Sequence, residues 1–141
     1  MNCPECGAAE RACEVRYHEC LAREFSEAGY GAAHHLTVAT YMLQHSSKLS
    51  REGWRYEREL LREFLAEGKS PEFVRRQNRE EVDDGRRSFK ITSPDGRPVV
   101  DAVRWTKTIL DVRLKDAETY CRDVKAWARA SLQDVEYLSI A

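Results

Sequence analysis

Apolar side chains recur at three- and four-residue steps along most of this chain, the spacing that gathers them on one face of an α-helix. The first such pattern covers residues 8–28 and stops at a glycine-rich break, residues 29–31. A second pattern covers residues 32–45. Because so short a segment connects them, we expect two antiparallel helices that form a hairpin within residues 1–45.

Three more helices are predicted after a polar break at residues 46–50. Ser50 is a suitable N-cap for the third helix, and Gly68 marks its end. The fourth helix, amphipathic and highly charged, covers residues 70–85. The last helix begins after the N-cap Asp116 and keeps one apolar face along its length.

The periodicity changes between the fourth and the last helix. A strong turn sequence there predicts either a short β-hairpin near residues 88–101 or an irregular excursion. Residues 105–112 suit either a short helix or an extended segment. The expected fold class is therefore mainly α, a bundle of about five helices in one domain over residues 1–141. Residues 50–141 would complete the bundle begun by the N-terminal hairpin.

Charge and composition exclude several partners. The 141 residues include 23 Lys and Arg and 24 Asp and Glu, a formal net charge of -1, so no global field attracts nucleic acid or an anionic membrane. The chain has no run near the ~18 apolar residues of a membrane-spanning helix. Five cysteines without a signal peptide favour a reducing cytoplasm. A protein partner or a second copy of the chain remains open.

The candidate chemistry lies in the first 45 residues. Cys3 and Cys6 form a CxxC pair followed by glycine, a spacing that lets two thiolates converge on one tetrahedral ion. In an antiparallel hairpin, Cys13 and His45 are equidistant from Gly29 and reach the same end. Cys3, Cys6, Cys13 and His45 would supply three thiolates and an imidazole, which suits a closed structural zinc site that includes an N-terminal zinc knuckle.

These residue types also have other uses in proteins. A redox dithiol usually opens a helix after a strand, and no strand precedes Cys3. Cys20 and Cys121 lie on apolar helix faces and suit the core, although Cys20 and His18 remain reserve ligands. His34 and His35 lie near the hairpin turn, about 16 Å along the helix from the proposed ion at 1.5 Å per residue.

Two stretches resemble a known family. One is the opening Cys3-Pro4-Glu5-Cys6-Gly7, followed by Cys13, and the other is residues 34–45, HHLTVATYMLQH. They resemble a bacterial family of uncharacterised proteins, a domain of unknown function with a CPxCG start, a further Cys and an HxLTVxxYxxQHP box. Ser46 stands where the box has Pro. The resemblance implies no activity, and it places these residues at motif positions: Cys3, Cys6, Cys13, His34, Gln44 and His45.

Three classes of function follow. The preferred one is a small zinc-containing protein whose metal is structural. The alternative is a metal-dependent hydrolase or transferase that uses histidines on facing helices, with Glu24 or Tyr41 as acid or base and with His34 and Gln44 as supporting or functional residues. The third, a zinc-knuckle module for nucleic acid or protein, is disfavoured for nucleic acid because the knuckle mixes Arg11 with acidic residues.

Overall fold

The computed structural model describes residues 2–9, 11–66, 70–72, 74, 76, 90–100 and 103–139. Within these ranges the chain is mainly α and contains no strand, which confirms the predicted class. Four α-helices are described, and they are α1 (Ala12–Ser26), α2 (His34–Gln44), α3 (Arg51–Leu65) and α5 (Ala117–Val135). Three short 3-10 helices are η1 (Tyr30–Ala33), η2 (Ser46–Lys48) and η3 (Ile109–Asp111).

Helix ends follow the capping residues of the sequence. The hydroxyl of Ser50 accepts a hydrogen bond from the Gly53 amide at 2.9 Å, and a carboxylate oxygen of Asp116 accepts one from the Thr119 amide at 2.7 Å. Both predicted N-caps are therefore confirmed, because these side chains satisfy amides that have no partner within the helix. The first helix begins at Ala12 rather than at residue 8, since residues 8 and 9 belong to the N-terminal loop.

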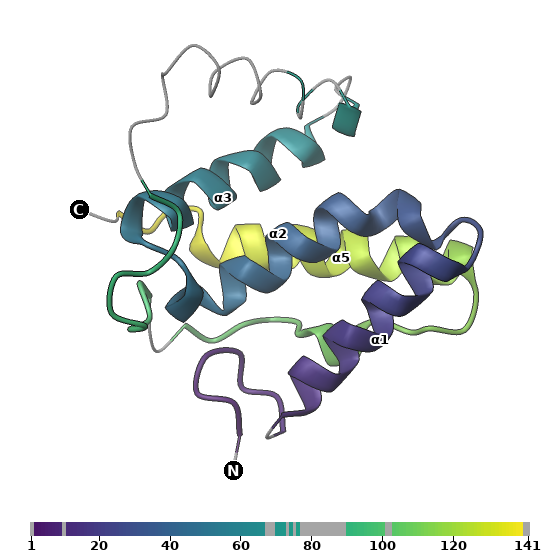
Figure 1. Cartoon of the computed structure of the whole chain (residues 1–141), viewed down its shortest axis with the longest axis horizontal. Helices are drawn as coiled ribbons and strands as arrows, with labels where there is room; N and C mark the ends of the chain where they lie inside the picture. The colour runs from purple at the N-terminus through teal and green to yellow at the C-terminus, as the bar shows by residue number, and fades with distance from the viewer. Residues whose placement is uncertain are drawn as a thin grey trace.

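The helices surround α2. In Figure 1, α2 crosses the centre of the molecule in front of α5, with α3 on one side and α1 on the other. The α1 and α2 helices run in opposite directions, as the hairpin prediction requires. The C-terminal end of α2 and the N-terminal end of α1 therefore come to the same side as the N-terminal loop.

The core is held by aromatic side chains and by one buried amide. Trp54 and Trp127 are fully buried, and the indole N–H of Trp54 donates to the carbonyl of Leu43 at 3.0 Å. The side-chain nitrogen of Gln44 donates to the carbonyl of Lys107 and to the hydroxyl of Ser131, each at 2.8 Å. Gln44 thus joins α2 to α5 and to the segment before η3. The glutamine of the HxLTVxxYxxQH box therefore has a packing role in the core and does not contact the cysteines.

The predicted β-hairpin near residues 88–101 is wrong for the part of it that the structure describes, residues 90–100. The backbone there pairs with residues 48–50 instead: the Ser50 amide donates to Ile91 O at 2.7 Å, and the Ser93 amide donates to Lys48 O at 3.2 Å. Gly53 permits this approach, because a Cβ at that position would lie 2.5 Å from Ile91 O. Residues 105–112 contain the 3-10 helix η3.

Two other predictions concern the fourth predicted helix and the buried face of the first. The fourth predicted helix, residues 70–85, lies mostly outside the described ranges. The three- and four-residue spacing of apolar residues in the first helix predicts that Phe25 lies on the buried face, but Phe25 is 77% exposed, whereas Glu24 beside it is buried. Among the residues that the structure describes, no helix combines the length and apolar character needed to cross a membrane.

Candidate metal centre

Residues 2–9 form a tight loop, called the knuckle below. Asn2 and Ala9 pair as an isolated bridge, the Cys3 amide donates to Ala8 O at 2.6 Å, and the Gly7 amide donates to Cys3 O at 2.9 Å. Gly7 has a φ of 84°, a left-handed conformation that glycine adopts without steric cost. The loop therefore turns back on itself between Cys3 and Gly7 and brings the two thiols of the CxxC pair together.

The other two members of the cluster come from helix ends. Cys13 lies in the first turn of α1, and His45 directly follows the last residue of α2. The donor atoms of Cys3, Cys6, Cys13 and His45 all lie within 4.8 Å of one another. Donors on a tetrahedral zinc with bonds of about 2.0–2.3 Å are separated by roughly 3.5–3.8 Å. The four side chains therefore form a compact cluster that could hold a metal ion.

His45 has the tautomer that a metal ligand needs. Its Nδ1 lies 2.8 Å from the carbonyl oxygen of Tyr41, and because a carbonyl can only accept, Nδ1 carries the proton. The other ring nitrogen, Nε2, is buried and has no hydrogen-bond partner among the described residues. Burial lowers the pKa of His45, which favours the neutral ring. Nε2 thus offers a lone pair to the cluster.

The three thiols affect one another. Burial raises the pKa of Cys6 and of Cys13, and the neighbouring thiolates raise both further. At Cys3 burial acts in the same direction, but hydrogen bonds from the backbone N–H groups of Cys6 and Glu5 and with the thiols of Cys6 and Cys13 together outweigh it and lower the pKa of that thiol. Three crowded thiols resist joint ionisation, and a divalent cation removes this penalty by attracting all three thiolates.

The knuckle is attached to the rest of the molecule through Glu5. Its two carboxylate oxygens accept hydrogen bonds from the amide and the hydroxyl of Ser47, each at 2.8 Å. Its carbonyl oxygen accepts the indole N–H of Trp105 at 2.8 Å. The sequence does not predict these contacts, since Ser47 and Trp105 lie far from Glu5 along the chain and carry no spacing signal.

Tyr41 supports the cluster by packing. Its ring stacks on Tyr17 with a centroid separation of 3.8 Å and on His45 with a separation of 4.0 Å. Burial raises the pKa of Tyr41, so the phenol stays protonated at neutral pH. The stack fills the space between α1 and α2 and fixes the plane of the His45 ring. This is a positioning role, distinct from the acid or base that the sequence also suggested for Tyr41.

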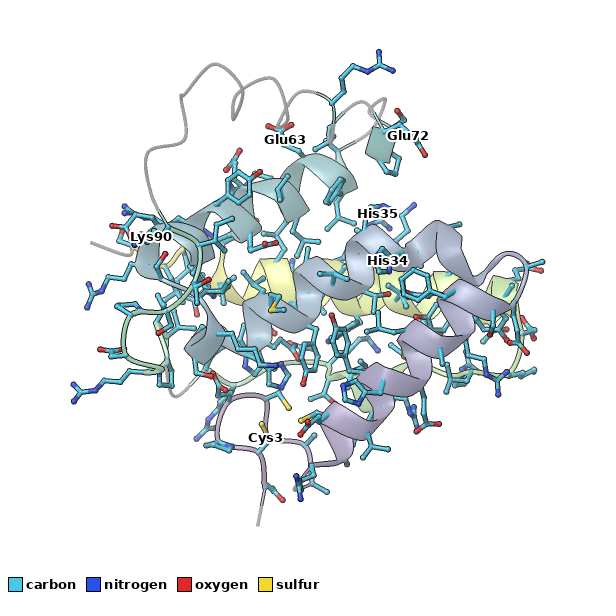
Figure 2. All side chains as sticks on the ribbon, in the orientation of Figure 1. Cys3, His34, His35, Glu63, Glu72 and Lys90 are labelled. Carbon is cyan, nitrogen blue, oxygen red and sulfur yellow. The ribbon has the colours of Figure 1, made fainter. Side chains whose placement is uncertain are left out.

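The remaining histidines do not belong to the cluster. Figure 2 places His34 and His35 near the opposite end of α2 from Cys3. His35 packs edge-on against Phe64, with ring centroids 4.8 Å apart, and His18 is exposed on α1. Of the two spare cysteines, Cys20 is fully buried as predicted. The prediction for Cys121 was only partly right, because its thiol is partly exposed and donates to Gly29 O at 3.4 Å.

Glu24 forms the centre of a second polar network. Its carboxylate accepts hydrogen bonds from His34 Nδ1 at 2.7 Å, from Thr37 Oγ1 at 2.6 Å and from the hydroxyl of Tyr120. The network joins α1, α2 and α5 and satisfies a carboxylate that is almost completely buried. The sequence singled out Glu24 and His34 but missed Thr37 and Tyr120. Thr37 follows His34 by three residues, which is the one local signal that could have linked them.

The chain is thus a small, mainly helical protein with a buried cluster of three cysteines and one histidine that could bind a metal. A family model described as a family of unknown function (DUF5946) matches residues 1–136, and the chain belongs to that family. The family resemblance inferred from the CPxCG start and the HxLTVxxYxxQH box is confirmed. Comparisons with curated proteins and with solved structures found no match.

Proposed function

We propose that Cys3, Cys6, Cys13 and His45 bind one zinc ion whose role is structural. The observation that carries the proposal is the environment of His45, a neutral imidazole in the same cluster as the three thiols: its Nδ1 is committed to Tyr41, and its Nε2 is buried without a hydrogen-bond partner among the described residues. A buried nitrogen without a partner costs free energy unless something binds it. Three thiolates with one imidazole match zinc better than magnesium or calcium, which prefer oxygen ligands.

The zinc would fasten the knuckle to α1 and α2. Residues 2–9 contain no regular secondary structure apart from an isolated bridge, so they contribute few helix hydrogen bonds of their own. Binding to ligands from the knuckle, the start of α1 and the end of α2 would hold all three together, and part of the binding free energy would become folding free energy. Because thiolate ligands must stay reduced, we place the protein in a reducing compartment such as the cytoplasm.

The alternative of a metal-dependent hydrolase or transferase has less support. Four protein ligands leave no open position for a metal-activated water. The groups that such an enzyme would need, Glu24 and His34, bond to each other and do not belong to the cluster. An interaction role remains compatible with the structural zinc, and the partner would then be a protein rather than nucleic acid, since the net charge is only -1.

The proposal is tested by elemental analysis of protein purified without a polyhistidine tag and without added metal. We expect about one zinc per chain and a lower melting temperature after chelation. Cys3→Ser and Cys13→Ser should each reduce zinc content and stability together. The matched control is Cys121→Ser, which removes a partly exposed thiol outside the cluster and should leave zinc content unchanged. Protein that is well folded without metal, with all cluster thiols free or with a Cys3–Cys6 disulfide, would contradict the proposal.

A further inference from the structure

The cluster is buried unevenly. Cys6, Cys13 and His45 are each 4% exposed, whereas Cys3 is only partly buried. Figure 2 shows Cys3 on the knuckle, at the side of the molecule opposite α3. Of the four side chains, Cys3 is therefore the one that a small molecule in solvent can approach.

A pocket of about 410 Å³ lies against this side of the cluster. Cys3 and Cys13 form part of its wall together with His45, and Tyr41 contributes an aromatic surface. Because Cys13 is almost completely buried, the pocket gives access mainly to Cys3. The volume is at the lower end of the range of small-molecule sites, which is roughly 300–1,000 Å³.

Charges around the pocket balance. Arg11 and Lys48 line it, and so do Glu5 and Glu14. Zinc with three thiolates and one neutral imidazole would add a net charge of about -1. The pocket therefore has no excess of positive charge that would attract anions. Its electrostatics suit a small uncharged ligand best.

A zinc centre of this composition keeps its sulfurs as thiolates at neutral pH, and the thiolate is the nucleophilic form of cysteine. We propose, on the basis of the zinc centre proposed above, that Cys3 is a modification site that accepts an alkyl group from a small uncharged carbon electrophile bound in this pocket. Cys6 and Cys13 hold the centre together and are shielded from the same reagent.

The step is a single displacement. The Cys3 thiolate attacks the electrophilic carbon, and a carbon–sulfur bond forms as the bond from carbon to the leaving group breaks. The electron pair of that bond departs with the leaving group as an anion. No proton moves, because the sulfur enters as a thiolate, and Cys3 becomes a neutral thioether. The centre then has two thiolates and one imidazole, and its net charge changes from -1 to zero.

The experiment uses zinc-loaded full-length Cys121→Ser protein, which lacks the second partly exposed thiol, and limiting iodoacetamide as the uncharged electrophile. Adducts are located by peptide mass spectrometry, and bound zinc is measured in the same samples. We expect Cys3 to react roughly tenfold or more faster than Cys6 and Cys13, with one adduct per chain. Zinc-free protein is the control, and there we expect the preference for Cys3 to decrease.

The outcomes separate the two proposals. If the purified protein holds no zinc, the structural-zinc proposal fails before any alkylation is measured. If zinc is bound but Cys3 stays unmodified, or if Cys6 and Cys13 react as fast as Cys3, the acceptor role of Cys3 is wrong while the zinc centre stands. Selective modification of Cys3 in zinc-loaded protein, with a smaller preference in zinc-free protein, supports both, whereas an equal preference with and without zinc would overturn the acceptor role because exposure alone would explain it.

Discussion

His45 Nδ1 lies 2.8 Å from the carbonyl oxygen of Tyr41, one helical turn earlier in the chain. The last turn of α2 therefore orients the imidazole of the residue that follows it and leaves Nε2 directed away from the helix backbone. A glutamine or an alanine at this position offers no equivalent nitrogen. The geometry of one helix end thus determines which atom the cluster receives.

We expect His45→Ala to weaken zinc binding by roughly 100-fold or more, beyond the 10–100-fold typical of losing a supporting contact around a metal. The measurement is zinc affinity by competition with a chromophoric chelator. His34→Ala is the matched control, since His34 bonds to Glu24 instead. Equal loss in both variants, or loss in His34→Ala alone, would show that the ligand set is wrong.

Glu5 should matter for stability although it donates no ligand atom to the cluster. Its carboxylate accepts both the amide and the hydroxyl of Ser47, so Glu5→Ala leaves two polar groups without their partner. We expect the free energy of unfolding, measured in urea, to fall by about 1–3 kcal/mol. Glu14→Ala removes an exposed carboxylate from the pocket that Glu5 also lines. This control should change the free energy of unfolding by less than about 0.5 kcal/mol. Similar losses in the two variants would contradict this role for Glu5.

The buried Glu24 network should be energetically separate from the zinc centre. Tyr120→Phe keeps the ring that packs on Tyr30 but removes a hydroxyl donated to the Glu24 carboxylate. We expect a loss of stability of about 1–3 kcal/mol with unchanged zinc content. Tyr137→Phe, at a side chain that is 80% exposed, serves as the control and should be nearly neutral. A parallel loss of zinc in Tyr120→Phe would show that the network and the centre are coupled.

The sequence predicted what depends on short-range periodicity. Helix spacing and a short turn were enough to place Cys13 and His45 at the same end of two antiparallel helices, because residues equidistant from a turn lie at the same level. The caps at Ser50 and Asp116 follow from local hydrogen bonding as well.

Contacts between distant segments could not be predicted in this way. Tyr120 reaches Glu24 from a helix 96 residues later, and Trp105 reaches the knuckle across 100 residues. The β-hairpin prediction failed for the same reason. The backbone of Ile91, within the predicted hairpin, pairs with the distant Ser50 rather than with a neighbouring strand. Period and spacing describe one segment at a time, whereas tertiary packing decides which segments meet.

Glu57 provides a test of pH dependence that is independent of the zinc. Burial raises the pKa of Glu57 from 4.5 to about 7 in the folded protein. The folded state therefore retains this proton at pH values where the unfolded state has lost it. Each unit of pH between about 4.5 and 7 should then reduce stability by up to about 1.4 kcal/mol. The stability that the protonated Glu57 contributes is complete below pH 4.5, the pKa in the unfolded state, and is lost above about pH 7, the pKa in the folded state.

Glu57→Gln keeps the size of the side chain and removes the titration. Relative to the unmodified protein, we expect the variant to be more stable at pH 8 by up to about 3 kcal/mol and to show little difference near pH 4.5. Because both proteins carry the same cluster, the difference between their urea unfolding curves isolates Glu57 from the thiols. Glu52→Gln, at an exposed position in the first turn of α3, is the control and should show no comparable pH-dependent gain. A constant difference between pH 4.5 and pH 8 would mean that Glu57 titrates normally in the folded state.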